Sequence, residues 1–305
     1  MIQKKTVLFH QEIRSRLQSA YASGTLHHAY LFTGPRGIGK ATMAVWLAQA
    51  VCCEKISSKN IPCGTCDHCR AVAHGTMPDV TIVGAERSLR AISIREVRDA
   101  QVKLSQTPLR GNYSVCILLD SDRCTIAAQN ALLKTLEEPY PRALLILTAA
   151  QPSRLLPTIH SRVVAIPLKR VVFRDMMRAL QSESVAGEQC APLARYAAGI
   201  PGRIFENFKL RGNRVSVLTQ VDALKRYTNA PFWELQAEMR KMYARYGNAP
   251  DALPQLLRNE MALLCRDQPV SSPARKTLSA LWSAEAHHVH QELALDLLAL
   301  SLKSL

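Results

Sequence analysis

Short apolar runs alternate with amphipathic segments along the first part of the chain. Five runs have the length and composition of buried strands, at 30–33, 80–83, 113–119, 143–150 and 163–167. Between them, apolar residues recur at helical spacing, and a capping-box sequence, Ser93 to Glu96, precedes one such segment. A further helix is predicted over residues 3–22. Strands that alternate with helices predict a parallel α/β sheet, whose ligands bind at the carboxyl ends of the strands.

The pattern changes after Leu168, where apolar runs of strand type give way to helical spacing. Short helices are predicted around a turn rich in glycine and proline at 198–203, and residues 213–305 have the apolar periodicity of a helical bundle. We therefore expect an α/β domain over 1–168, a small helical domain over 169–210 and an all-α domain over 211–305.

The composition narrows the classes of partner. The 305-residue chain carries a formal net charge of +15, which favours polyanions such as DNA, RNA or nucleotides. No run approaches eighteen uninterrupted apolar residues, and the first residues lack the apolar segment of a secretion signal. A cytoplasmic protein without a membrane partner is expected.

A glycine-rich turn joins the first apolar run to the next amphipathic segment. Gly34, Gly37 and Gly39 precede Lys40, an arrangement typical of phosphate-binding loops, in which backbone amides, a lysine and a helix N-terminus receive an anion. The pattern requires serine or threonine directly after the lysine, where a hydroxyl holds Mg²⁺. Ala41 has no hydroxyl, which raises the question of whether this site supports catalysis.

Four of the nine cysteines lie close together, within residues 53–69. Two residues separate Cys63 from Cys66 and Cys66 from Cys69, a spacing typical of zinc sites, and an upstream cysteine completes a tetrahedral sulfur set. We prefer Cys53 to Cys52 as the fourth ligand because Cys52 lies nearer the body of the preceding helix. Four thiolates leave no open coordination position, so the metal would be structural; a disulfide cluster is the alternative.

The end of the predicted strand 113–119 carries a second residue pair that is relevant to nucleotide hydrolysis. The run 113–119 is followed by Asp120, the position of a second Mg²⁺-organising carboxylate in P-loop ATPases. The next residue in such ATPases is a glutamate that polarises the attacking water. Ser121 stands there instead, and a serine hydroxyl is not a base near neutral pH.

Four segments together resemble the bacterial clamp-loader branch of the AAA+ ATPases, the family of DNA polymerase III gamma/tau and delta prime subunits. They are the loop segment 28–40, the four-cysteine insert, Asn-Ala-Leu-Leu-Lys-Thr-Leu-Glu-Glu-Pro at 130–139 and Leu-Pro-Thr-Ile-His-Ser-Arg at 156–162. All four occur in the family's order and spacing. The resemblance implies an AAA+ domain with a zinc-binding insert at 1–168, a lid domain at 169–210 and a collar domain for oligomerisation at 211–305.

The resemblance also implies roles for single residues. Lys40 and its glycines would bind nucleotide together with Asp120, Thr42 would offer a shifted hydroxyl, and Arg203 would be the sensor of the lid domain. Arg162 would be an arginine finger that acts in trans on the nucleotide of a neighbouring subunit. Such a finger stabilises transition-state charge by roughly 10³- to 10⁵-fold.

Three departures from the family concern the chain's own hydrolysis. They are Ala41, Ser121 and the pair Ala149 and Ala150, which stands where the motor subunits carry the polar residue that senses the γ-phosphate. Because Arg162 is retained while these groups are lost, the pattern is that of delta prime, which lends an arginine to a gamma/tau ATPase. We expect binding of ATP or ADP without turnover.

This resemblance further implies partners and a process. The chain would assemble with gamma/tau and delta subunits in a heteropentamer and would help to place a sliding clamp on primed DNA during replication. DNA polymerase activity would reside in another subunit of the holoenzyme. Two alternatives are an active gamma/tau-type ATPase and a zinc-dependent nucleic-acid-binding module, although the insert has few basic residues and no interleaved aromatics.

Overall fold

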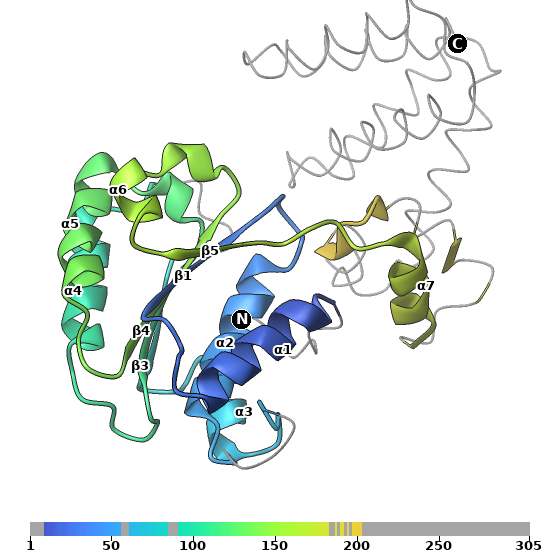
Figure 1. The fold of residues 1–305 in the computed structure, drawn as a ribbon, viewed down its shortest axis with the longest axis horizontal. Helices are drawn as coiled ribbons and strands as arrows, with labels where there is room; N and C mark the ends of the chain where they lie inside the picture. The colour runs from blue at the N-terminus through green and yellow to red at the C-terminus, as the bar shows by residue number, and fades with distance from the viewer. Residues whose placement is uncertain are drawn as a thin grey trace, which may run out of the picture. The chain divides into compact units, whose positions relative to one another are not determined.

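A computed structural model describes residues 9–55, 61–84, 91–182, 187, 190, 191, 194 and 197–202 (Figure 1). All of them belong to one compact unit, Met1–Arg203. The predicted collar domain and the last part of the predicted lid domain lie outside the described residues, so those domains stay predictions. None of the described helices combines the length and apolar character that crossing a bilayer requires.

Five parallel strands form one sheet in the order β2-β3-β4-β1-β5. They are β1 (Ala29–Thr33), β2 (Val80–Val83), β3 (Ser114–Leu118), β4 (Ala143–Ala149) and β5 (Val164–Pro167). The central strand, β4, is buried along its whole length, and its Leu145 pairs with Cys116 of β3 and Ala29 of β1. The predicted parallel α/β sheet is confirmed, with one strand for each of the five apolar runs.

Helices cover both faces of the sheet (Figure 1). One face carries α1 (Gln11–Ala22), α2 (Lys40–Cys52) and α3 (Asp67–His74); the other carries α4 (Ile94–Leu104), α5 (Ile126–Glu137) and the short α6 (Pro157–His160). In β1, Tyr30 and Phe32 join the apolar core beneath α2, whereas Leu31 joins the core beneath α4 and α5. Because successive strand residues point to opposite faces, a sheet covered on both sides needs continuous apolar runs.

Local sequence signals explain where several helices begin. The Ser93 hydroxyl accepts from the amide of Glu96, whose carboxylate accepts from the Ser93 amide, so the predicted capping box starts α4. The first helix begins later than predicted, at Gln11. His10 has a left-handed backbone, with φ of 60°, which a continuous right-handed helix does not contain.

Beyond β5 the chain becomes helical, as the periodicity predicted, with α7 at Phe173–Ser182. The turn at residues 200–202 then returns to the glycine-rich loop. The Gly202 amide donates to the Gly37 carbonyl at 2.7 Å. A Cβ at Gly202 would lie 2.5 Å from the Gly37 Cα, so only glycine permits this backbone approach.

We expect Gly202→Ala to lower the free energy of unfolding by about 1–3 kcal/mol, because the added methyl group meets rigid backbone. Urea unfolding of the full chain measures the change. Gly187→Ala is the control: Gly187 is exposed, has helical backbone and has open space around it, so alanine is expected to stabilise by up to about 1 kcal/mol. Equal stability of the Gly202 variant and the wild type would contradict the close contact.

Candidate functional site

The glycine-rich loop lies at the carboxyl end of β1, where parallel sheets bind ligands. The chain leaves β1 at Thr33, passes Gly34 and enters α2 at Lys40. Gly34 has φ of 143°, and a Cβ there would lie 2.7 Å from the Leu168 carbonyl oxygen. The loop therefore packs directly on the segment that follows β5, and the helix N-terminus after it favours an anion.

The Lys40 ammonium is held against its own loop. Lys40 is 7% exposed, and Nζ donates to the carbonyl oxygens of Gly34 at 2.8 Å and Pro35 at 3.1 Å. Burial lowers the pKa of Lys40, although the carboxylates of Asp120 and Asp122 oppose this effect. The Lys40 ammonium is thus bonded to the glycine-rich loop and lies close enough to Asp120 and Asp122 to interact with their charges.

Asp120 and Ser121 lie at the carboxyl end of β3, separated from the loop by β4. The Asp120 amide donates to Thr148 Oγ1 at 2.9 Å, and the Ser121 hydroxyl donates to the Thr148 carbonyl at 2.9 Å. Ser121 and Ala149 are completely buried. The serine hydroxyl is therefore buried and bonds the turn after β3 to β4.

The sequence analysis missed two polar residues at this edge. Thr148, the residue that ties β3 to β4, lies inside an apolar run and gave no signal. Asp122 belongs to the 3₁₀ turn η1 (Ser121–Arg123); its Oδ2 accepts from the Gln151 amide at 2.9 Å. The other oxygen, Oδ1, is buried without a hydrogen-bond partner in the described part of the chain. The sequence did offer one signal for Asp122, because it lies two residues after Asp120 at the end of the same predicted strand.

Other predicted nucleotide residues have different outcomes. Thr42 lies half-buried in the first turn of α2, two residues after Lys40. Ala150, the residue after β4, is also half-buried. Arg203 lies outside the described residues. The structure thus brings the loop, Lys40 and the acids after β3 to one edge of the sheet and leaves the role of each residue as a prediction.

Arg162 lies between α6 and β5 and bonds to two different elements. Its NH2 group is 2.9 Å from Oε1 of Glu137, the last residue of α5, and NH1 donates to the Thr158 carbonyl and the Ser161 hydroxyl, each at 3.0 Å. The Arg162 side chain is 34% exposed. The guanidinium is therefore oriented, yet open to solution.

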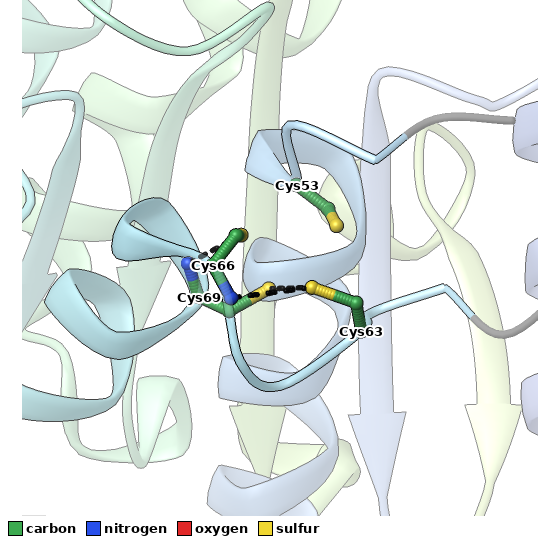
Figure 2. Close-up of side chains that lie close together, drawn as sticks. All are labelled: Cys53, Cys63, Cys66 and Cys69. Atoms are coloured by element: carbon green, nitrogen blue, oxygen red, sulfur yellow. Dashed lines mark hydrogen bonds between the residues drawn. The ribbon is translucent and has the colours of Figure 1, made fainter. Parts of the chain in front are cut away.

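The four predicted cysteines converge on one point (Figure 2). The sulfur atoms of Cys53, Cys63, Cys66 and Cys69 all lie within 4.8 Å of one another. Cys53 follows the end of α2, and Cys66 is the residue before α3. The Cys66 amide donates to Cys63 Sγ at 3.4 Å and the Cys69 amide to Cys66 Sγ at 3.3 Å, an arrangement that stabilises thiolates.

The structure distinguishes the two adjacent cysteines. Cys52 lies outside the cluster: its Sγ is 3.9 Å from the Tyr113 carbonyl, and burial raises the pKa of this thiol to about 12. Burial opposes ionisation of Cys63 too, but hydrogen bonds from Thr65 and Cys66 outweigh it and lower the pKa of Cys63 to about 6. Four sulfur donors and no other side chain form a set that fits Zn²⁺, with Cys53 as the fourth member.

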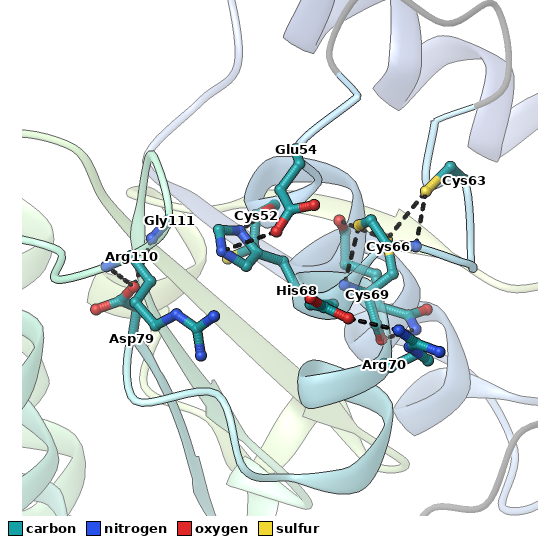
Figure 3. Close-up of polar contacts among 12 residues, drawn as sticks. Cys52, Glu54, Cys63, Cys66, His68, Cys69, Arg70, Asp79, Arg110 and Gly111 are labelled. Atoms are coloured by element: carbon teal, nitrogen blue, oxygen red, sulfur yellow. Dashed lines mark hydrogen bonds and ion pairs between the residues drawn. The ribbon is translucent and has the colours of Figure 1, made fainter.

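Polar contacts attach the cysteine cluster to the α/β domain (Figure 3). His68 Nδ1 donates to the Cys52 carbonyl at 2.9 Å, and its Nε2 lies 3.2 Å from Glu54 Oε1. Gln49 donates to the Cys69 carbonyl at 2.8 Å. The end of α2 and the start of α3 therefore hold each other through side-chain bonds as well as through the cysteines.

A buried carboxylate fixes the neighbouring loop. Asp79 is 7% exposed and accepts from the amides of Leu109, Arg110 and Gly111 at 2.6, 2.8 and 2.6 Å (Figure 3). Burial acts to raise the pKa of Asp79, but the three amide bonds outweigh it, so the pKa lies below its ordinary value. The charged form of Asp79 thus stabilises the fold.

We expect Asp79→Ala to lower the free energy of unfolding at pH 7 by about 2–4 kcal/mol, since three amides lose a charged acceptor. The folded-state pKa is depressed, so this stabilisation is present above the unfolded-state value of about 3.9 and is lost as pH falls through the folded-state value. Urea unfolding from pH 7 to pH 3 measures it. The exposed Asp99→Asn is the control, and a pH-independent difference would contradict the interpretation.

Comparison with known proteins identifies the family. Residues 9–172, more than half of the chain, match the family described as DNA polymerase III, delta subunit. The delta' subunit of Pseudomonas aeruginosa DNA polymerase III is 42% identical over 144 residues, which cover 46% of this chain and 43% of the relative. The tau subunit of Escherichia coli is 32% identical over 199 residues, covering 63% and 30%. The match thus spans less than half the length of either relative.

A solved structure shows the same fold. The crystal structure of a DNA polymerase III gamma subunit-related protein from Thermotoga maritima aligns with a TM-score of 0.56 and 18% identity, covering 96% of this chain and 98% of that one. The predicted resemblance is confirmed by the family match together with the delta' and tau relatives. This chain belongs to the DNA polymerase III delta-subunit family.

Proposed function

We propose that this chain is a delta prime-like subunit of a bacterial DNA polymerase III clamp loader. It would assemble with gamma/tau and delta subunits, in a heteropentamer held by its C-terminal domain, and help to place a sliding clamp on primed DNA. Its own ATP hydrolysis would be absent or vestigial. Family membership supports the assembly, since relatives that are 42% and 36% identical are named as delta' and tau subunits of DNA polymerase III.

One observation supports a subunit that assists hydrolysis elsewhere without hydrolysing ATP itself. Arg162 is exposed to solution, whereas Ser121, which stands where active ATPases carry the catalytic glutamate, is buried. Arg162 is 34% exposed and held by Glu137, Thr158 and Ser161. Ser121 is completely buried, with its hydroxyl bonded to β4. A subunit so built would stabilise charge on another subunit's nucleotide and would have no base to activate water at its own site.

The loop at the end of β1 would still bind nucleotide. Lys40 and the glycine-rich turn would hold the phosphates of ATP or ADP, and Asp120 would face the accompanying Mg²⁺. With Ala41 in place of a hydroxyl residue, metal binding would be weak. The bound nucleotide would therefore serve to order the loop and the adjoining 200–202 turn, which touch at Gly37 and Gly202.

An active gamma/tau-type ATPase is the second candidate function, and Asp122 is the observation that favours it. This carboxylate lies near Lys40 and keeps one oxygen unpartnered in the described structure. ATP hydrolysis by the isolated full-length chain tests this candidate. Turnover that Lys40→Ala abolishes would establish it and overturn the delta prime-like assignment.

The cysteine cluster would hold a structural Zn²⁺. Four sulfurs fill a tetrahedral site completely, so no coordination position is left for substrate. The metal would stabilise the segment between α2 and β2, in whose described residues the eight-residue α3 is the one named helix.

We expect Arg162→Ala to reduce ATP hydrolysis by the reconstituted complex of this chain with gamma/tau and delta subunits by at least about 1.5-fold, because one of at most three gamma/tau sites in the pentamer loses its arginine. Loss of an arginine finger lowers the rate at the site it serves by roughly 10³-fold or more, while the other sites continue. Clamp- and DNA-stimulated phosphate release measures the rate. Assembly, followed by size-exclusion chromatography, should not change.

Arg16→Ala is the matched control, because Arg16 is exposed on α1, on the opposite face of the sheet from α5 and α6 (Figure 1). A complex containing this variant should hydrolyse ATP at the wild-type rate. Normal hydrolysis by the Arg162→Ala complex would remove the arginine-finger assignment and with it the proposed function.

The zinc assignment predicts different outcomes for two adjacent cysteines. Purified wild-type chain and Cys52→Ser are expected to contain about one Zn²⁺ each, whereas Cys53→Ser loses a ligand and most of the metal. Metal analysis by plasma emission spectrometry and the thermal midpoint are the measurements. Retention of zinc by Cys53→Ser, or its loss from Cys52→Ser, would contradict the ligand set.

A further inference from the structure

The ion pair between Arg162 and Glu137 joins two segments that are far apart in the sequence. Glu137 ends α5, and Arg162 follows α6, the short helix that packs beside it (Figure 1). The NH2 group and Oε1 are 2.9 Å apart. The negative end of the α5 dipole also faces this region, which favours a cation there.

The bonds of Arg162 leave part of the guanidinium available. A guanidinium has five N–H donors, two on each terminal nitrogen and one on Nε. NH1 uses both of its donors, on Thr158 and Ser161, whereas NH2 forms the ion pair with Glu137. Among the described residues no acceptor takes a hydrogen bond from Nε. The guanidinium therefore keeps N–H groups that can bind an oxyanion.

The pair contributes little to the stability of the fold. Glu137 is 51% exposed and Arg162 is 34% exposed, and water screens the attraction between charges at such positions. The ion pair instead restricts the orientation of the Arg162 guanidinium. The Thr158 and Ser161 contacts come from the same short segment as Arg162, whereas Glu137 alone ties the guanidinium to a separate helix.

We propose that Glu137 is a positioning residue for Arg162. Its carboxylate pairs with NH2 and so holds the guanidinium in one orientation, with its remaining N–H groups available to the nucleotide phosphate of a neighbouring subunit. This inference rests on the proposed function, in which Arg162 acts in trans. A side chain oriented before the reaction loses less entropy in the transition state, and misplacement by about 1 Å can reduce a rate by roughly 10²-fold.

The test is ATP hydrolysis by the complex of full-length chain with gamma/tau and delta subunits. We expect Glu137→Ala to lower kcat of the complex at saturating ATP by about 1.5-fold, and by no more than Arg162→Ala does, with the KM for ATP unchanged, because orientation and not ground-state binding is lost at the one site served. Glu137→Gln keeps the size and an acceptor oxygen, and should give an intermediate rate. The adjacent Glu138→Ala, which removes an exposed carboxylate without an ion pair among the described residues, should leave kcat unchanged.

A double variant separates positioning from other roles. If Glu137 acts through Arg162, adding Glu137→Ala to Arg162→Ala lowers kcat no further. An additional decrease by the same factor as in the single variant would overturn the inference. A wild-type rate for Glu137→Ala beside a slow Arg162→Ala would overturn it as well, but would leave the proposed function intact. A wild-type rate for Arg162→Ala would end both.

Folding controls accompany these rates. Thermal midpoints and complex assembly of the Glu137 variants are expected to equal those of the wild type, as an exposed pair predicts. If Glu137→Ala were to unfold, Glu137→Gln decides the question: a kcat equal to that of the wild type would then contradict the need for the full negative charge, and a decrease would support it.

Discussion

The position of β4 between β1 and β3 is the constraint on which the candidate nucleotide site depends. Parallel strands end at the same edge, so the loop after β1 and the acids after β3 must lie on either side of the end of β4. The hydroxyl and carbonyl of Thr148 bond to the residues after β3, and the Gly34 amide donates to Ala149. One completely buried strand thus fixes both halves of the edge relative to each other.

Much of this fold was predictable because its signals are local. A sheet covered on both faces requires continuous apolar runs, and each of the five runs became a strand. The capping box at Ser93 lies within four consecutive residues, so it too could be recognised. The start of α1 could not, because the left-handed backbone of His10 has no signature in a histidine side chain.

The candidate site was predictable only where chemistry follows spacing. The separations among Cys63, Cys66 and Cys69 predict a sulfur cluster, and the structure places the Cys53 sulfur in that cluster and the Cys52 sulfur beside the Tyr113 carbonyl. The contact of Gly202 with Gly37 and the pair of Glu137 with Arg162 join residues far apart in the chain. No periodicity or motif encodes such partners, which only the packed structure brings together.

The helix α2 connects the two candidate sites physically. It begins at Lys40, ends beside Cys53 and, with thirteen residues, is about 20 Å long. Helix ends ordinarily fray, but the last turns of α2 are bonded to Tyr21, His68 and Cys69. At the opposite end, Lys40 is bonded to the carbonyl oxygens of Gly34 and Pro35. One rigid helix is therefore anchored at both ends, with the glycine-rich loop at its start and the cysteine cluster at its finish.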